Sequence, residues 1–320
     1  MQIITGKQVE QELSMSNCIG LMQEALIALS NGDAKQIVRP VLPLYDQNVL
    51  GIMPAYLASR KIAGVKVLAV FPNNYQKGIP SHQGQMLVFD TETGCVKALV
   101  DAESLTGIRT AAASAAVTAV LARPDASQLA ILGAGLQGRQ HLEAIRLVRK
   151  LREVTVWDIR FEAAVRYAAE MQQKTGLSVR ACASAAEATR DADIICTLTP
   201  SREPILFAAD VKPGAHINAV GACTPAAREL ASDLVAAGRL FTDWRPAAVL
   251  EAGDYLLALQ DGSIGEEHIL GEVGQVLSGT LSGRLSDTDI TIFEALGQAL
   301  EDLIVADYVT DALSKRRDFL

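Results

Sequence analysis

The pattern of hydrophobic and polar positions along the chain changes near residue 128. Between residues 37 and 115 the chain holds short β-prone runs separated by turn residues, in the order IVRPVLPLY, VLGIMPAYL, IAGVKVLAVF, QGQMLVFD and VKALVD. Beyond residue 128, strand-like and helix-like segments alternate, beginning with QLAILG, QGRQHLEAIRLVRK, EVTVWD and FEAAVRYAAEMQQKTG. Such alternation predicts an α/β fold whose parallel sheet carries helices on both faces.

Further helices and strands are predicted near both ends of the chain and between the two regions. The pattern predicts a strand at Gln2–Ile4, an amphipathic helix through NCIGLMQEALIALS, and an alanine-rich helix over residues 106–122. The stretch ITIFEALGQALEDLIVADYVTDALSK near the C-terminus is predicted to be helical. A chain of 320 residues should form one large domain or two modest ones.

Composition excludes several classes of protein. The formal net charge of −8 leaves no basic surplus to neutralise phosphates, which argues against nucleic acid as a partner. Five scattered cysteines without CxxC spacing fit reduced thiols and give no metal framework. Neither a signal-peptide pattern nor an uncharged run of membrane-spanning length is visible. We therefore expect a cytoplasmic protein with no membrane partner and no metal.

The sharpest motif is GAGLQG, in which Gly133, Gly135 and Gly138 follow a predicted strand and open a predicted helix. In a dinucleotide-binding loop the first glycine permits the turn, the second lets the backbone approach a pyrophosphate, and the third allows close packing of helix and strand. The amide groups at the start of the helix then attract the phosphates. This context favours a dinucleotide site over a structural glycine turn.

An acidic residue follows the next predicted strand, as the same motif requires. Asp158 would accept hydrogen bonds from the ribose hydroxyls and repel a 2′-phosphate, which favours NAD(H). Arg160, two residues later, would instead pair with a 2′-phosphate, so NADP(H) stays open as the alternative.

Cations embedded in apolar sequence are candidates for a substrate site. Arg39 lies between Val38 and Pro40, Lys66 lies within GVKVLAV, and Arg109 follows Ile108 near the start of the alanine-rich helix. A lysine within such a strand either faces solvent or holds an anion, because lysine and arginine are rarely buried unless paired. For Arg109 a cofactor phosphate or a substrate carboxylate is a suitable partner.

Together these segments resemble one known family. The order RP, GIMPAY, GVKVLAVFPNN, GIPSHQG, LVFDTETG, TGIRTAAASA, ILGAGLQG and HINAVGA, then P and REL, is similar to the ornithine cyclodeaminase/mu-crystallin family over nearly the whole length. The resemblance implies a Rossmann NAD(P)-binding domain over residues 116–295. Residues 1–115 and 296–320 would then form a substrate-binding domain that makes a homodimer through its sheet.

The resemblance also assigns roles to individual positions. Arg39 and Lys66 match residues that bind the substrate carboxylate, and Arg109 joins them in the pocket. The cofactor positions are Ser81, His82, Gln83, Arg109, Thr110, Gly133, Ala134, Gly135, Leu136, Gln137, Gly138, Asp158, Ile159, Arg160, Thr197, Thr199, Val220 and Ala222.

The loop in HINAVGACTPAAREL separates branches of the family. Ornithine cyclodeaminases carry an aspartate at the position that aligns with Ala222, where it manages protons on the substrate amines. The mu-crystallin-like branch has a small residue there, shares the GA-x-x-P-x-x-REL pattern, and reduces cyclic ketimines such as Δ1-pyrroline-2-carboxylate and Δ1-piperideine-2-carboxylate. Ala222 therefore points to an NAD(P)H-dependent ketimine reductase that produces L-proline or L-pipecolate.

Imine reduction needs a clamp for the carboxylate and a nicotinamide close to the ring carbon. We expect Arg39 to hold the carboxylate and Lys66 to assist, donating a proton through water; His82 is a weaker candidate for the proton donor. Alanine dehydrogenase activity, ornithine cyclodeaminase activity and a crystallin-like binding protein without catalysis remain as alternatives.

Overall fold

The computed structural model describes residues 1–318, without the side chains of residues 75, 76, 317 and 318. Contacts within the chain divide it into two compact units. Unit 1 is Met1–Thr110 together with the segment from Gly297 to the end of the described chain, and unit 2 is Ala111–Leu296. The predicted boundaries, 115/116 and 295/296, differ from these by a few residues.

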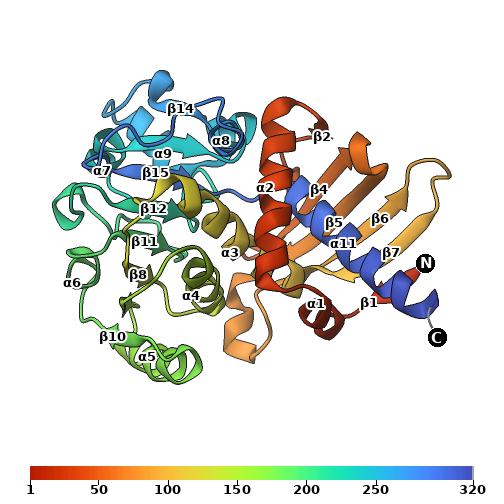
Figure 1. Ribbon diagram of the computed structural model, residues 1–320, viewed down its shortest axis with the longest axis horizontal. Coiled ribbons are helices and arrows are strands. Elements are labelled where there is room, and N and C mark those ends of the chain that lie inside the picture. Colours follow the sequence, from red (N-terminus) through yellow and green to blue (C-terminus); the bar gives the residue numbers. More distant parts are fainter. Residues whose placement is uncertain (319–320) are drawn as a thin grey trace. The chain divides into compact units, whose positions relative to one another are not determined.

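Unit 1 is built on a mostly antiparallel sheet in the order β1-β7-β6-β5-β4-β2, with β3 also paired to β4. Its elements are β1 (Gln2–Ile4), α1 (Gly6–Glu12), α2 (Met15–Asn31), β2 (Ala34–Gln36), β3 (Val41–Pro43), β4 (Val49–Leu57), β5 (Ile62–Val70), β6 (His82–Asp90), β7 (Val96–Asp101) and α11 (Ala299–Asp318). Figure 1 shows α2 and α11 side by side, and α11 packs on β4, β5 and β6.

Strand β5 has two different faces because successive side chains point to opposite sides of a sheet. Ile62, Gly64 and Lys66 are buried on one face, whereas Ala63 and Val65 are partly exposed on the other. A side chain at Gly64 would meet Leu303 of α11, since a Cβ there would come within 2.7 Å of the leucine methyl group. The buried face is therefore the one that α11 covers.

Unit 2 contains a sheet in which all eight strands run parallel, in the order β10-β9-β8-β11-β12-β15-β13-β14. Its strands are β8 (Gln128–Leu132), β9 (Glu153–Trp157), β10 (Ser178–Ala181), β11 (Ile194–Thr197), β12 (His216–Ala219), β13 (Arg239–Thr242), β14 (Ile269–Glu272) and β15 (Thr291–Glu294). Its helices are α4 (Leu136–Val148), α5 (Phe161–Thr175), α6 (Ala185–Thr189), α7 (Ser232–Ala237), α8 (Arg245–Glu251), α9 (Gly253–Gln260) and α10 (Val273–Leu277).

The strand order reverses between β8 and β11, because the chain first builds outward through β9 and β10 and then returns to the other side of β8. In open α/β sheets such a switch point opens a crevice at the carboxyl ends of the strands, where ligands bind. The predicted α/β class with a parallel sheet is confirmed, and Figure 1 shows this sheet with its connecting helices.

Three predicted elements need correction. The C-terminal stretch is not helical throughout: Thr291–Glu294 forms strand β15 between β12 and β13, and the helix begins only at Ala299. A short, fully buried apolar strand cannot be distinguished from a helical segment by periodicity. In IVRPVLPLY only Val41–Pro43 is a strand, and it begins directly after Pro40, which lacks the amide hydrogen that a ladder needs.

The alanine-rich helix, α3, spans Ala102–Leu121 and so begins earlier than predicted. Among the described helices it is the one long and apolar enough to cross a membrane by length and composition. However, 72% of its apolar window is buried inside the protein, as in a core helix.

Candidate functional site

The glycine loop after β8 has the geometry that its motif requires. Gly133 has φ +116°, and a Cβ there would come within 2.8 Å of the carbonyl oxygen of Leu198, so the turn needs glycine. A Cβ at Gly138 would overlap the carbonyl oxygen of Gly133, which is the close helix–strand approach predicted for the third glycine. Gly135 is exposed, and a Cβ there would meet nothing within 4 Å. The loop therefore leaves open space above its backbone at the start of α4.

An arginine that the sequence analysis did not identify fixes this loop. Arg139 Nη1 donates to the carbonyl oxygens of Ala134 at 2.8 Å and Gly135 at 3.0 Å, and its other nitrogens bind Glu170. Its guanidinium also stacks 5.5 Å from the ring centre of Tyr167. Because Arg139 binds the carbonyl oxygens of the loop, the loop amides can point toward an anion at the start of the helix.

Asp158 follows β9 and faces the glycine loop. Its Oδ2 accepts a hydrogen bond from the Ala134 amide and its Oδ1 accepts one from the Arg160 amide, both at 3.0 Å. The Arg160 side chain is 72% exposed and its Nε lies 3.7 Å from Asp158. Ile159 between them is 88% exposed, an apolar side chain left in solvent. The motif places the adenosine of a dinucleotide beside Asp158, Ile159 and Arg160.

Four more of the predicted cofactor positions lie where β11 and β12 end. Thr197 ends β11, and Thr199 follows in the next loop, where it binds the carboxylate of Glu229. Val220 and Ala222 follow β12, and Ala222 is 2% exposed. These residues share the carboxyl edge of the sheet with the glycine loop.

These features fit a dinucleotide. The first helix turn presents amides, Gly135 leaves room for a pyrophosphate, and Asp158 offers carboxylate oxygens beside the loop. Gln137 lies in the same turn, and its Oε1 is buried without a hydrogen-bond partner in the described structure. A buried carbonyl oxygen without a donor is costly, and a bound ligand would relieve it.

In unit 1, Lys66 lies on the covered face of β5 and is 3% exposed. Its ammonium group pairs with Asp302 of α11 and lies 3.5 Å from the hydroxyl oxygen of Thr106. Burial lowers the pKa of Lys66 to about 8, against the charge of Asp302 and together with those of Arg109 and Arg39. The alternative that this lysine faces solvent is wrong; it is a buried cation that can exchange its proton near neutral pH.

Arg109 lies well inside α3 and not at the helix entrance, because the helix begins at Ala102. Its Nε donates to Asp302 at 2.9 Å and its Nη1 to Glu301 at 3.0 Å. Gly297, with φ +75°, allows this approach, since a Cβ there would come within 2.5 Å of the guanidinium. Burial raises the pKa of Asp302, but the opposing charges of Arg109 and Lys66 lower it overall.

Arg39 and His82 are the other two basic residues predicted in this unit, and both interact electrostatically with Lys66. Arg39 is half-buried, and its Nη2 donates to the carbonyl oxygen of Gly297 at 3.2 Å. His82 begins β6, and its Nδ1 lies 3.0 Å from the hydroxyl of Ser81. Although His82 is exposed as a residue, the protein around its ring and the charge of Lys66 lower its pKa, so neutral imidazole is favoured.

The other two positions predicted in this unit make local contacts. Gln83 Nε2 donates to the carbonyl oxygen of Pro80 at 3.4 Å. Thr110 Oγ1 donates to the carbonyl oxygen of Thr106 at 2.8 Å within α3.

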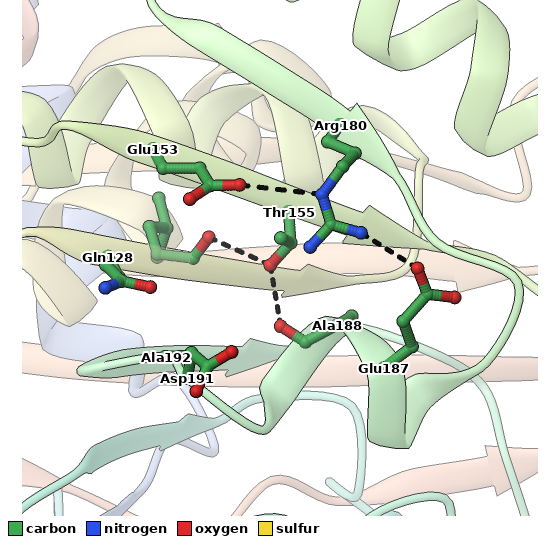
Figure 2. Close-up of a pocket in the computed structure, with 9 residues that line it drawn as sticks. Gln128, Glu153, Thr155, Arg180, Glu187, Ala188, Asp191 and Ala192 are labelled. Carbon is green, nitrogen blue, oxygen red and sulfur yellow. Dashed lines mark hydrogen bonds and ion pairs between the residues drawn. The ribbon is translucent and has the colours of Figure 1, made fainter.

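A small hollow elsewhere in unit 2 is not a substrate site. Figure 2 shows Arg180 between Glu153 and Glu187, with Thr155 donating to the carbonyl oxygen of Ala188 at 2.7 Å. The free space is about 30 Å³, enough for a single water. Within residues 1–318 no cluster of His, Cys, Asp and Glu is arranged to hold a metal ion.

Comparison with known proteins identifies the family. The sequence model of the ornithine cyclodeaminase/mu-crystallin family matches residues 1–317. The chain belongs to this family. It is 38% identical over 316 residues to the ketimine reductase mu-crystallin of Mus musculus, with 97% of each chain covered.

Two solved structures are similar over almost their whole length. The Δ(1)-pyrroline-2-carboxylate reductase of Thermococcus litoralis, in complex with NADH and L-proline, superposes with a TM-score of 0.96 at 34% identity, covering 99% of this chain and 98% of that one. An archaeal alanine dehydrogenase dimer with bound NAD has a TM-score of 0.93 at 34% identity, covering 99% and 97%.

For this family member the structure adds groups that the sequence analysis missed. Glu301 and Asp302 lie in the stretch predicted to be helical and have no predicted role, although buried cations such as Lys66 and Arg109 need acidic partners. Glu229 was quoted only as part of the REL pattern, and no feature of the sequence alone shows that its side chain binds two loops. Arg139 directly follows the glycine motif, which was a usable signal.

Proposed function

We propose that this protein reduces a cyclic ketimine with NADH, converting Δ1-pyrroline-2-carboxylate or Δ1-piperideine-2-carboxylate to L-proline or L-pipecolate. The observation that carries the proposal is the group of cations in unit 1, with Lys66 buried at a pKa of about 8. It is supported by similarity to a ketimine reductase of mouse and to a reductase of Thermococcus litoralis solved with NADH and L-proline.

In the proposed reaction Arg39 binds the substrate carboxylate, since a guanidinium matches a carboxylate in geometry and charge. Lys66 holds a proton on Nζ, and Asp302 keeps that ammonium in place within the buried face. Protonation of the ring nitrogen makes the imine carbon a strong hydride acceptor. When bound, NADH supplies the hydride, so one hydride and one proton convert C=N to CH–NH.

Arg109 takes a supporting role in this proposal. Its guanidinium binds Glu301 and Asp302, so we propose that it positions Asp302, which in turn pairs with Lys66. The substrate or cofactor contact that the family resemblance implies is a second role. We further propose that unit 1 binds substrate and that unit 2 binds the dinucleotide through Gly133, Gly135, Gly138 and the other cofactor positions predicted within Ala111–Leu296.

We favour NADH over NADPH because Asp158 stands at the ribose position and would repel a 2′-phosphate. The two similar structures described above were solved with NADH or NAD. Arg160 keeps NADPH as the alternative, since its exposed side chain could turn to a phosphate.

Ornithine cyclodeamination is disfavoured by the loop after β12. Ala222 provides no carboxylate. Glu229 is the acid of that loop, yet both of its oxygens accept hydrogen bonds from Thr199 and Gly221, so it is not free to manage protons on a substrate amine.

Alanine dehydrogenase activity is the second candidate, favoured by the similarity to the archaeal alanine dehydrogenase. The two activities differ in their need for ammonium, because reductive amination of an oxo acid consumes ammonia whereas imine reduction does not. NADH oxidation with Δ1-pyrroline-2-carboxylate in ammonium-free buffer supports our proposal; oxidation only with pyruvate and ammonium supports the alternative.

We also propose a homodimer formed through the open face of the unit 1 sheet. That face carries an apolar groove lined by Ile37, Pro54, Tyr56, Val65 and Phe89, and the similar alanine dehydrogenase is a dimer. The free cysteines of the described chain fit a reducing compartment, and we place the enzyme in the cytoplasm.

The test of the catalytic proposal is Lys66→Ala beside the wild type. Loss of imine-dependent NADH oxidation with unchanged NADH binding supports it. Full turnover by the variant removes Lys66 from the mechanism.

A further inference from the structure

We propose that Glu229 is a positioning residue that sets, before any cofactor arrives, the two loops on which the nicotinamide half of the dinucleotide binds. The inference rests on the proposed function and deepens it. These loops follow β11 and β12 and contain Thr199, Gly221 and Ala222, next to the glycine loop at the switch point of the sheet.

The side chain of Glu229 connects the two loops directly. Its Oε1 accepts hydrogen bonds from the Thr199 amide at 2.6 Å and the Thr199 hydroxyl at 2.7 Å. Its Oε2 accepts one from the Gly221 amide at 2.7 Å. Three donors on two oxygens is the pattern of an ionised carboxylate, which accepts and cannot donate. The residue is fully buried, so each bond is made away from competing water.

Glycine at 221 is what allows this contact. A Cβ there would come within 2.5 Å of Oε2 of Glu229 and would overlap the carbonyl oxygen of Thr199. The backbone of one loop therefore lies against both the carboxylate and the other loop. Neither loop can move without breaking these contacts.

The backbone of Glu229 is fixed in turn. The amides of Glu229 and Leu230 both donate to Asp254 Oδ1 at 2.8 Å, and the carbonyl oxygen of Glu229 accepts from the amides of Ile205 and Leu206. Gly253, beside Asp254 at the start of α9, donates to the carbonyl oxygen of Ala222 at 3.0 Å. The carboxylate is thus carried by a rigid frame and not by a free loop.

Burial raises the pKa of Glu229 itself, but the hydrogen bonds from Thr199 and Gly221 oppose that shift because they stabilise the charged form. The neighbouring acids are shifted in the same direction. Burial, together with the charge of Glu229, raises the pKa of Asp254 to about 7. Burial, Asp254 and Glu229 raise the pKa of Glu294 well above its ordinary value. Asp254 Oδ2 and Glu294 Oε2 are buried without hydrogen-bond partners among the described residues, which disfavours the charged form of both acids.

Glu229→Gln tests the inference, with Asp193→Asn as the matched control. Glutamine keeps one oxygen that accepts from Thr199 but turns an NH2 group toward the Gly221 amide, so the hydrogen bond from Gly221 is lost. Asp193 is also a buried carboxylate that accepts two backbone amides, from Ser127 and Gln128, but it lies at the amino end of β11. Its other oxygen pairs with Arg123 and Lys212. Both variants should lose stability, and only Glu229→Gln should affect the cofactor loops.

We expect NADH binding, measured by the fluorescence of the bound nicotinamide, to weaken about tenfold in Glu229→Gln, the effect of losing one hydrogen bond to a charged group. The KM for imine should change less than about twofold, since Arg39 is untouched. Hydrogen exchange of the Thr199 and Gly221 amides should accelerate in the cofactor-free variant. Asp193→Asn should leave NADH binding and both amides as in the wild type.

Wild-type NADH affinity in Glu229→Gln, or equal weakening in Asp193→Asn, would overturn the inference. If Glu229→Gln does not fold, amide exchange in the wild type decides: both amides should be protected without NADH, and protection that appears only on binding would refute the preset loops. A wild type that binds NADH but reduces no imine would refute the proposed function alone.

Discussion

Replacing Asp302 by asparagine should make the stability and the activity of this protein depend on pH in a new way. The variant keeps the size of the side chain and one oxygen for Arg109, but removes the negative charge that holds the ammonium of Lys66. Of the groups that act on Lys66, burial, Arg109 and Arg39 all lower its pKa, and only Asp302 raises it. Without Asp302 the pKa of Lys66 must fall further below about 8.

The sign of the stability effect follows from proton binding. A lysine whose pKa is lowered in the folded state binds fewer protons there than in the unfolded chain, so its contribution to stability grows as pH rises through the interval between the two pKa values. At about pH 6 the variant must either bury an unpaired ammonium or release its proton, and the loss of one partner costs about 3–5 kcal/mol. At about pH 9 the wild-type lysine is already mostly neutral, so the part of the loss that comes from Lys66 disappears. The part that comes from Arg109, which stays charged, is the same at both pH values.

Two assays check this prediction. Denaturant unfolding at about pH 6 and about pH 9 should show a loss of unfolding free energy that is larger at the lower pH. In the proposed reaction, we expect the falling limb of the wild-type pH–rate profile near the Lys66 pKa of about 8, and it should move to lower pH in the variant.

Glu301→Gln is the control, because Glu301 pairs with Arg109 from the same helix and does not contribute to the pKa shift of Lys66. Its destabilisation should not depend on pH in this range. An equal loss for Asp302→Asn at both pH values, with an unmoved rate profile, would refute the assignment of the Lys66 proton to this ion pair.

Three further predictions concern other parts of the chain. Asp254→Asn keeps an oxygen for two backbone amides and removes a carboxyl whose pKa is raised to about 7 in the folded protein. Because such a carboxyl makes the folded state less stable as pH rises from its ordinary pKa to about 7, the variant should need about 2 kcal/mol more than the wild type to unfold at about pH 8. An unchanged free energy of unfolding would contradict the repulsion described for this cluster. Asp158→Ala should weaken NADH binding about tenfold and NADPH binding less, which titration of both cofactors would show, whereas equal losses would mean that the acid does not select the cofactor. Val65→Lys places a charge in the apolar groove of unit 1 and should convert a dimer to a monomer in light scattering, with a persistent dimer locating the interface elsewhere.

Much of the fold could be predicted from local pattern. The strands around Lys66 alternate in burial as an antiparallel sheet with one covered face should, and β4 spans Val49–Leu57 as its apolar run predicts. The end of α5 at Gly176, in the left-handed region with φ 73°, also follows from its sequence. Where the signal was a short buried run, as in Thr291–Glu294, only the pairing with neighbouring strands shows that it is a strand.

The candidate site divides in the same way. The three glycines and Asp158 lie within one βαβ unit, so spacing along the chain is enough to bring them together. The partners of Lys66 and Arg109 come from a helix more than half the chain away, and the partners of Glu229 lie in two separate loops. Such contacts depend on tertiary packing, and one sequence without pairing information contains no local signal for them.

Strand β5 has a consequence for how this protein tolerates change. One face of β5 is covered by α11 and carries Ile62, Gly64 and Lys66, and the opposite face carries Ala63 and Val65. Neighbouring residues are therefore under different selective pressures. Substitution of Lys66 should alter the chemistry with the assembly intact, whereas substitution of Val65 should alter the assembly with the chemistry intact. A slip of one residue in the pairing of β5 would exchange the two sets, placing the lysine outside and a valine against Asp302. An insertion or deletion within these nine residues is therefore expected to be lost from functional variants, even where single substitutions on either face persist.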